Sequence, residues 1–157
     1  MTTKKVLIPI DGSDFSLQVL EQVKQFFDPQ VSELILLEVA QEPDMVELRP
    51  FPDEDLSIYT DEAEYALREQ ITEGLEPLAQ KLRDAGFKAR AEVRFGEPMS
   101  AIEDFINNDG VDLVAMTTHG RTGLNRVLFG SVAQHVLHHC TVPILLYRSL
   151  VPERVPA

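Results

Sequence analysis

Residues 113–132 read LVAMTTHGRTGLNRVLFGSV, and this stretch decides the fold because it joins a buried strand to a helix through a glycine-punctuated loop. Residues 113–116 are an apolar run, typical of a strand that is covered on both faces. Ser131 and Gln134 have the spacing of a capping box, which predicts a helix start. Gly130 stands directly before them. Because glycine has no side chain, its presence indicates that the backbone passes close to another group at this point. The free N–H groups and positive dipole of such a helix favour an anion, most naturally a phosphate.

The rest of the chain alternates strands with helices. Strands are predicted at residues 6–10, 33–39, 89–95 and 143–147, with helical patterns between them. This order predicts a single-domain α/β protein with an open parallel sheet of five strands and helices on both faces. Residues 89–95 alternate small or apolar with charged side chains, as an edge strand with one wet face does. The expected strand order is therefore 3-2-1-4-5.

Local signals set the expected boundaries of the helices. Ser13 and Thr60 are predicted N-caps, Gly86 is a predicted C-cap, and Pro77 predicts a kink or break in the long helix after residue 60. Residues 40–59 have no period and are predicted to form a long irregular loop. Two further helices are expected to bury one face each. The buried face of the first is formed by Val19, Leu20, Val23 and Phe27. The second starts at Gly96-Glu97-Pro98, and its buried face is formed by Ile102, Phe105 and Ile106.

The predicted strand order also predicts where a ligand binds. In open parallel sheets the ligand lies beyond the carboxyl ends of the strands at which the order reverses, here the first and fourth strands. Asp11 follows the first of these strands, and residues 117–120 follow the other. Two separate features of the sequence therefore converge on one crevice.

These residues also carry a family resemblance. Thr117-x2-Gly120-x9-Gly130-Ser131 resembles the nucleotide motif G-x2-G-x9-G-[S/T] of the universal stress protein family, with Thr117 in place of the first glycine. The resemblance extends from Val6-Leu-Ile-Pro-Ile-Asp11 to Pro143-Ile-Leu-Leu-Tyr147. It implies a fold like that of the adenine nucleotide α-hydrolases, spanning residues 1–150, with residues 151–157 as a short tail.

The resemblance implies a set of nucleotide-binding residues. Gly120, Gly130, Ser131 and the Val132 amide would meet the phosphates, and Arg121 could add charge. Asp11 would contact the adenine or ribose, and the Val39 backbone would read the adenine edge. The whole predicted set is Pro9, Ile10, Asp11, Val39, Met116, Thr117, His119, Gly120, Arg121, Gly130, Ser131 and Val132.

The function implied by the resemblance is binding of ATP, or of AMP or ADP, in stress response or regulation of an unidentified protein partner. Magnesium or manganese would accompany the nucleotide through its phosphates. The sequence has no Walker lysine pattern and no paired carboxylates with an evident metal role, so any ATP hydrolysis is expected to be slow. Thr117 keeps a second hypothesis open, a dimeric interaction module of the same fold that binds no nucleotide.

Composition narrows the classes of partner. The chain has 157 residues, a net charge of −12 and nine acidic residues against one arginine between Glu42 and Glu64, which argues against nucleic acid and anionic membranes. It has no apolar run of the roughly 20 residues that span a bilayer. The single cysteine, Cys140, suits a reducing cytoplasm.

The last strand, Pro143–Tyr147, is apolar although it should form an edge, so we expect it to pair across the two-fold axis of a homodimer, as in the resembling family.

Two alternatives concern chemistry. His135, His138, His139 and Cys140 have spacings that a metal site could use, whereas imidazoles near a helix C-terminus are also explained by the helix dipole. Residues 11–16 can be compared with the S-G-G-x-D-S loop of ATP pyrophosphatases. That match is poor, because Asp11 and Ser13 replace the first serine and second glycine.

Overall fold

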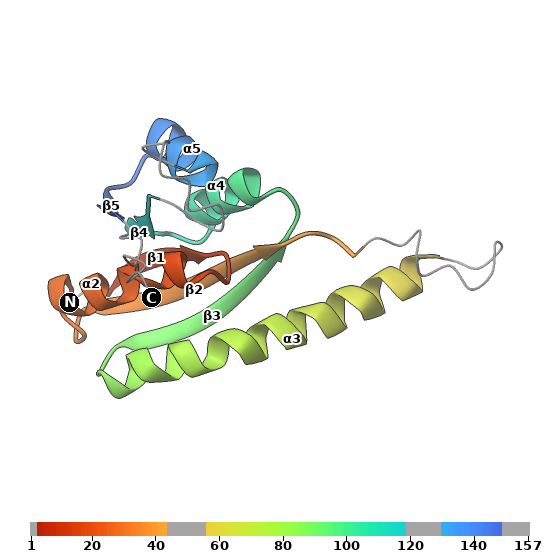
Figure 1. Ribbon diagram of the computed structural model, residues 1–157, viewed down its shortest axis with the longest axis horizontal. Helices are drawn as coiled ribbons and strands as arrows, with labels where there is room; N and C mark the ends of the chain where they lie inside the picture. The colour runs from red at the N-terminus through yellow and green to blue at the C-terminus, as the bar shows by residue number, and fades with distance from the viewer. Residues whose placement is uncertain (1–2, 44–55, 119–129, 149–157) are drawn as a thin grey trace, which may run out of the picture.

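The computed structural model describes residues 3–43, 56–118 and 130–148 of the chain. Within them, five parallel strands form one sheet in the order β3-β2-β1-β4-β5 (Figure 1), which confirms the predicted architecture. The predicted tail, most of the predicted loop at residues 40–59, and residues 119–129 lie outside the described ranges. The strands are β1 (Lys4–Ile10), β2 (Ser32–Ala40), β3 (Lys88–Phe95), β4 (Leu113–Thr117) and β5 (Ile144–Tyr147).

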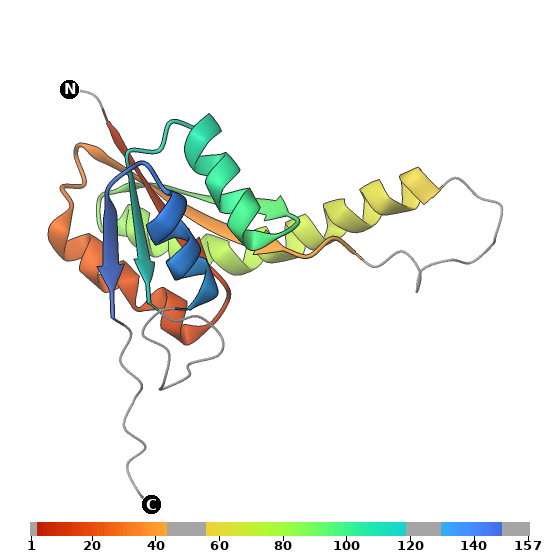
Figure 2. The same ribbon diagram turned by 90° about the horizontal axis from the view of Figure 1, so that it is seen from above.

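Helices cover both faces of the sheet (Figures 1 and 2). One face carries α1 (Asp14–Leu17), α2 (Val19–Phe26) and α3 (Leu56–Asp84), and the other carries α4 (Pro98–Asn108) and α5 (Ser131–His139). Each face has its own hydrophobic core, because successive side chains of a strand point to opposite faces. Leu34 and Leu36 belong to the first core, and Ile35 and Leu37 to the second.

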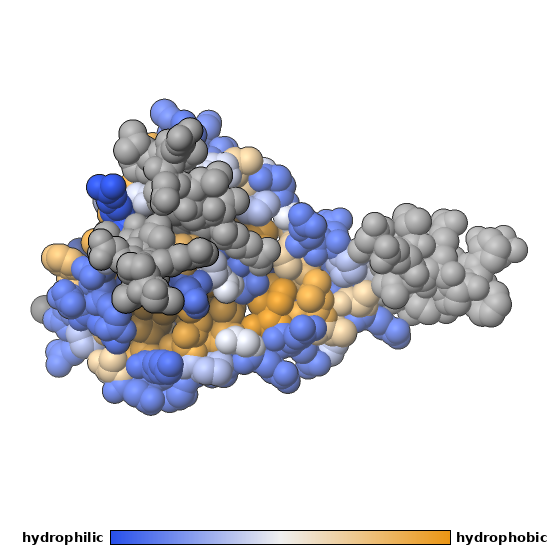
Figure 3. Space-filling model, viewed as in Figure 1, coloured by the Kyte–Doolittle hydropathy of each residue, from blue (hydrophilic) through white to orange (hydrophobic). Residues whose placement is uncertain are grey.

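The central strands are apolar along most of their length because both faces are covered. Leu34, Ile35, Leu36 and Leu37 are all fully buried in β2. On the face of the molecule shown in Figure 3, hydrophobic residues form a strip between α2 and α3, with hydrophilic residues on both sides. Among the described residues, no helix has both the length and the apolar character needed to cross a membrane.

Several predicted caps are confirmed. The Ser13 Oγ accepts a hydrogen bond from the Ser16 N–H at 3.2 Å and so begins α1. Gly86 has a φ of +94°, and the two hydrogen bonds that end α3, Gly86 N to Arg83 O and Phe87 N to Leu82 O, have the Schellman pattern.

Two boundary predictions are wrong, and a third is wrong in part. The first predicted helix is divided in two at Gln18, where α1 ends and α2 begins. The long helix starts at Leu56, so Thr60 lies inside α3 and is not its N-cap. Of the kink or break predicted at Pro77, the break is absent, since α3 runs through that residue. Pro77 is exposed, whereas Leu75 and Ala79 on either side of it are buried in the core, so packing onto the sheet holds the helix across the proline.

Candidate functional site

A cavity of about 270 Å³ lies at the carboxyl ends of β1 and β4. Nine of the twelve predicted site residues line it, namely Pro9, Ile10, Asp11, Val39, Met116, Thr117, Gly130, Ser131 and Val132. The other three, His119, Gly120 and Arg121, lie outside the described residues. The described part of the predicted set is thus brought together in one place.

The crevice opens because β1 and β4 separate before they end. Their pairing, Val6 with Leu113 and Leu7 with Val114, stops three residues short of the end of β1. Pro9 lies in this unpaired part, and it has no N–H group to offer a neighbouring strand. The part of β1 that no longer pairs with β4 therefore contains Pro9, the one residue of the strand that cannot donate a backbone hydrogen bond.

The N-terminus of α5 forms one wall. Gly130 is the N-cap and Ser131 is the first helical residue, so the predicted capping box with Ser131 as the cap is wrong. Gly130 supplies no side-chain cap, and its carbonyl already accepts the first helical bond from Gln134 N at 2.9 Å. Ser131, Val132 and Ala133, the first turn, all line the cavity. The positive end of the helix dipole therefore faces the cavity, with no side-chain oxygen of the N-cap residue in front of it.

The end of β4 holds this helix start in place. The Gly130 N–H donates to the Thr118 carbonyl, and the Thr118 N–H donates to the Tyr147 carbonyl at 2.9 Å. Thr117 and Thr118 are 6% and 5% exposed and both line the cavity. Two consecutive backbone bonds therefore connect the last strand, the end of β4 and the first turn of α5.

Asp11 lines the cavity from a tight turn that directly follows β1. Its Oδ1 accepts hydrogen bonds from the Ser13 N–H at 3.0 Å and the Ser13 Oγ at 2.6 Å. Ser16 lies against the same turn, where its Oγ donates to the Ser13 carbonyl at 2.8 Å. Ser16 is 5% exposed and lines the cavity, although sequence reasoning did not select it. Its position three residues after a predicted N-cap was the signal that could have found it.

The remaining wall is apolar. Leu37, Ile102 and Met116 are buried and line the cavity together with Pro98. Ile102 was predicted as core, and Pro98 as the start of a helix, so the contribution of α4 to the site was missed. It follows from topology, because the loop between β3 and α4 leaves the sheet at the same carboxyl end as Asp11 and Thr117.

The second helix that begins at the cavity, α4, has its own anionic cap. The Glu97 carboxylate accepts hydrogen bonds from the Ser100 N–H at 2.8 Å and the Ser100 Oγ at 3.1 Å. The backbone bond from Ser100 lowers the pKa of Glu97 below its ordinary value, with a smaller contribution from His135. The start of α4 is therefore neutralised by its own side chain, and the start of α5 is not.

The histidines of α5 lie away from this cavity. His135 Nε2 lies 3.1 Å from Glu103 Oε2 on α4, and its ring stacks on that of His139 at 4.1 Å between centroids. His139 Nδ1 lies 3.0 Å from the His135 carbonyl, and the Cys140 thiol contacts the Val142 carbonyl. Within residues 3–43, 56–118 and 130–148, no three histidine, cysteine or acidic side chains are arranged to hold a metal ion.

Comparisons with known proteins match this chain to a family. The family model described as "Universal stress protein family" matches residues 2–148. Universal stress protein MJ0577 of Methanocaldococcus jannaschii is 29% identical over 153 residues, covering 92% of this chain and 94% of the relative. A solved structure of protein MJ0577 matches with a TM-score of 0.78 and 28% identity over 96% of this chain and 99% of that one.

Two more distant structures share the fold. A universal stress protein family protein from Arabidopsis thaliana, solved with AMP bound, has a TM-score of 0.65 at 16% identity and covers 96% of this chain and 94% of its own. A universal stress protein in complex with cAMP has a TM-score of 0.61 at 19% identity, with 94% and 98% covered. By the match of the family model along almost its whole length, the chain belongs to the universal stress protein family.

Proposed function

We propose that the chain binds an adenine nucleotide, ATP or its products ADP and AMP, in the cavity between β1, β4 and α5. One observation carries the proposal. A helix N-terminus without a side-chain cap, an apolar wall and an oriented carboxylate all face the same cavity. A nucleotide has an anionic tail, an apolar base and a polar sugar, so it can use all three.

The phosphates would lie at the first turn of α5. Free N–H groups and a positive dipole end bind phosphate oxygens without any lysine or arginine. This matters here because the described lining residues include no lysine or arginine, and the chain as a whole is acidic. Magnesium or manganese would neutralise part of the phosphate charge, and Arg121, outside the described residues, would supply more.

The base and ribose would lie toward β1 and β2. Leu37, Ile102 and Met116 offer an apolar surface to the flat base, and the Val39 backbone lies at the end of β2 beside it. The Asp11 carboxylate can accept hydrogen bonds from ribose hydroxyls. Family members of the same fold support this choice of ligand class, since one was solved with AMP and another with cAMP.

We place the nucleotide in a regulatory role in stress response, with slow turnover at most. The expectation of slow turnover rests on the sequence, which has no Walker lysine pattern and no paired carboxylates with an evident metal role. The working form would be a cytoplasmic homodimer that pairs through residues 143–147. β5 is an edge strand whose four side chains are half-buried, and no strand within the described residues pairs with its outer side.

Thr117 supports a second candidate, an interaction module of the same fold that holds no nucleotide. Its buried side chain stands at the cavity where the family motif has its first glycine. In that case the cavity is too restricted for a ligand, and the dimer surface carries the function.

Isothermal titration with ATP and AMP, each with and without magnesium, tests the proposal. Ser131→Asp places a carboxylate at the start of α5, so we expect it to abolish binding while keeping a good helix start. Gln134→Asp is the matched control, because it adds the same charge to an exposed position of the same helix that does not line the cavity. No heat and no thermal shift at millimolar nucleotide for the unmodified chain would establish the second candidate instead.

A further inference from the structure

The two edge strands of the sheet make different contacts with the rest of the chain. β3 and β5 are the edge strands, and an edge strand displays a row of backbone N–H and C=O groups to which another chain can add a strand. If both edges accepted strands, copies of this chain could pair β3 to β5 without end. Pairing of β5 with β5 closes on itself as a dimer, whereas β3-to-β5 pairing does not.

The outward-facing groups of β3 can be identified from one hydrogen bond. Directly after the strand, the Gly96 N–H donates to the Ala40 carbonyl of β2 at 3.0 Å. Because the backbone groups of successive residues point to opposite sides, even-numbered residues of β3 face β2 and odd-numbered residues face outward. Ala89, Ala91 and Val93 therefore present their carbonyl and N–H groups at the open edge.

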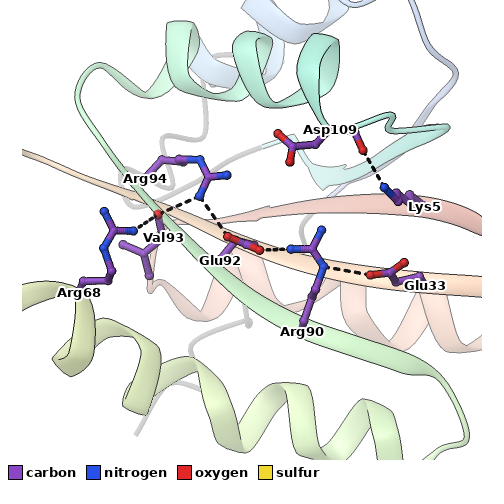
Figure 4. Close-up of polar contacts among 8 residues, drawn as sticks. All are labelled: Lys5, Glu33, Arg68, Arg90, Glu92, Val93, Arg94 and Asp109. Carbon is purple, nitrogen blue, oxygen red and sulfur yellow. Dashed lines mark hydrogen bonds and ion pairs between the residues drawn. The ribbon is translucent and has the colours of Figure 1, made fainter. Parts of the chain in front are cut away.

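Three arginines occupy this edge. Arg83 Nη1 donates to the Ala89 carbonyl at 2.8 Å, and Arg68 Nη1 donates to the Val93 carbonyl at 2.6 Å, both from α3. Arg94 Nη1 reaches the same Val93 carbonyl at 3.3 Å from the other face of the sheet, as Figure 4 shows. The three are called the edge arginines below.

Each edge arginine is held in place by other contacts. The Arg68 guanidinium lies 4.9 Å from the centre of the Phe95 ring. The Arg94 guanidinium lies 4.9 Å from the Phe105 ring and 3.0 Å from Glu92. Arg83 is bonded to the side chains of Gln80 and Glu76 on its own helix.

We propose that the edge arginines close β3 to strand addition by a second copy of this chain, so that self-association through strand pairing is confined to β5. An incoming strand needs the carbonyls of Ala89 and Val93 as acceptors, and it would have to displace charge-assisted hydrogen bonds that are already preorganised. The closed edge makes assembly stop at a dimer instead of continuing as a fibre. This inference is independent of nucleotide binding.

The triple variant R68A/R83A/R94A tests the proposal by sedimentation velocity on the full chain across a concentration series. We expect species at least twice the mass of those of the unmodified chain, increasing with concentration. K81A/R90A/K88A is the matched control. It also removes three positive charges from α3 and β3, but none of these side chains is bonded to an outward carbonyl among the described contacts. We expect it to keep the original mass.

A third variant separates edge opening from loss of stability. Ala91→Pro, added to the triple variant, removes an outward N–H without removing a bond to β2, so it should block strand addition and restore the original mass. Larger species that Ala91→Pro leaves unchanged would overturn the proposal, because they would come from unfolding. An unchanged mass in the triple variant, with a normal circular dichroism spectrum, would also overturn it.

Discussion

Thr117 is a buried residue whose side chain takes up room at the wall of the cavity. It is 6% exposed, it ends β4, and it lines the cavity beside the first turn of α5. We predict that Thr117→Gly tightens AMP binding about tenfold, equal to about 1.4 kcal/mol, because backbone can then approach the ligand. The same change should lower the free energy of unfolding by at least about 1 kcal/mol, since glycine weakens a strand.

Titration calorimetry and chemical denaturation measure the two effects separately. Thr117→Val is the control, because it keeps the bulk of the side chain and removes the hydroxyl. We expect no tightening for Thr117→Val. If valine and glycine tightened binding equally, the hydroxyl and not the bulk would be responsible, and the prediction would be wrong.

At the same scale, sequence could identify positions that depend on backbone chemistry. Gly130 marked the start of α5 and Gly86 the end of α3, because these roles depend on local conformation. Ser131 was assigned the wrong role, N-cap instead of first helical residue, because the capping pattern is shifted easily by one position. Ser16 and Pro98 were missed at the site because their place in it depends on the path of the chain through space.

The Glu97 side chain caps the N-terminus of α4 and contributes to the stability of this helix. Its carboxylate caps α4 by accepting from the Ser100 N–H, and this bond lowers the pKa of Glu97 below the ordinary 4.5. A carboxyl whose folded pKa is depressed stabilises the fold above its unfolded pKa, and this contribution is lost as the pH falls through the folded pKa. The cap should therefore stabilise the protein at neutral pH and not in acid.

We predict that Glu97→Gln lowers the melting temperature at pH 7, and that its difference from the unmodified chain shrinks as the pH falls below 4.5. Thermal melts followed by circular dichroism between pH 7 and pH 3 would measure this. Asp104→Asn removes an exposed carboxylate from the same helix away from the cap. A pH-independent difference for Glu97→Gln would show that the charge of the cap does not matter.

Elements as a whole were easier to predict than their boundaries. The apolar runs of β1, β2 and β4 and the alternation in β3 predicted each strand and its place in the sheet. The start of α3 was missed because residues 40–59 show no helical period in the sequence. Its path through Pro77 was not predicted because it depends on the burial of Leu75 and Ala79 on either side of the proline, through contacts between parts of the chain that are distant in sequence. Local propensity therefore gave the order of elements, and tertiary packing accounts for the continuity of α3 across Pro77.

For the molecule as a whole, the strand order produces the candidate site and the proposed dimer surface together. β4 separates from β1 at the cavity and pairs with β5 on its other side, so the cavity and the apolar edge are one strand apart. The Tyr147 carbonyl accepts from the Thr118 N–H, and the Pro143 carbonyl accepts from the Val114 N–H. The backbone groups of residues 143 and 147 therefore face β4. The backbone groups of Ile144 and Leu146 therefore face outward, where a second copy would pair.

We predict that the unmodified chain is the proposed dimer and that Leu146→Pro converts it to a monomer. Proline removes the outward N–H of residue 146 that a second β5 strand would use as a donor, and it leaves the bonds between β5 and β4 intact. Sedimentation equilibrium at micromolar concentration should then give the mass of one chain, against two for the unmodified protein. Leu146→Val keeps the N–H and the apolar surface, so it should remain dimeric. A Leu146→Pro dimer as stable as that of the unmodified chain would place the two-fold interface somewhere other than β5, and a monomeric unmodified chain would rule the interface out.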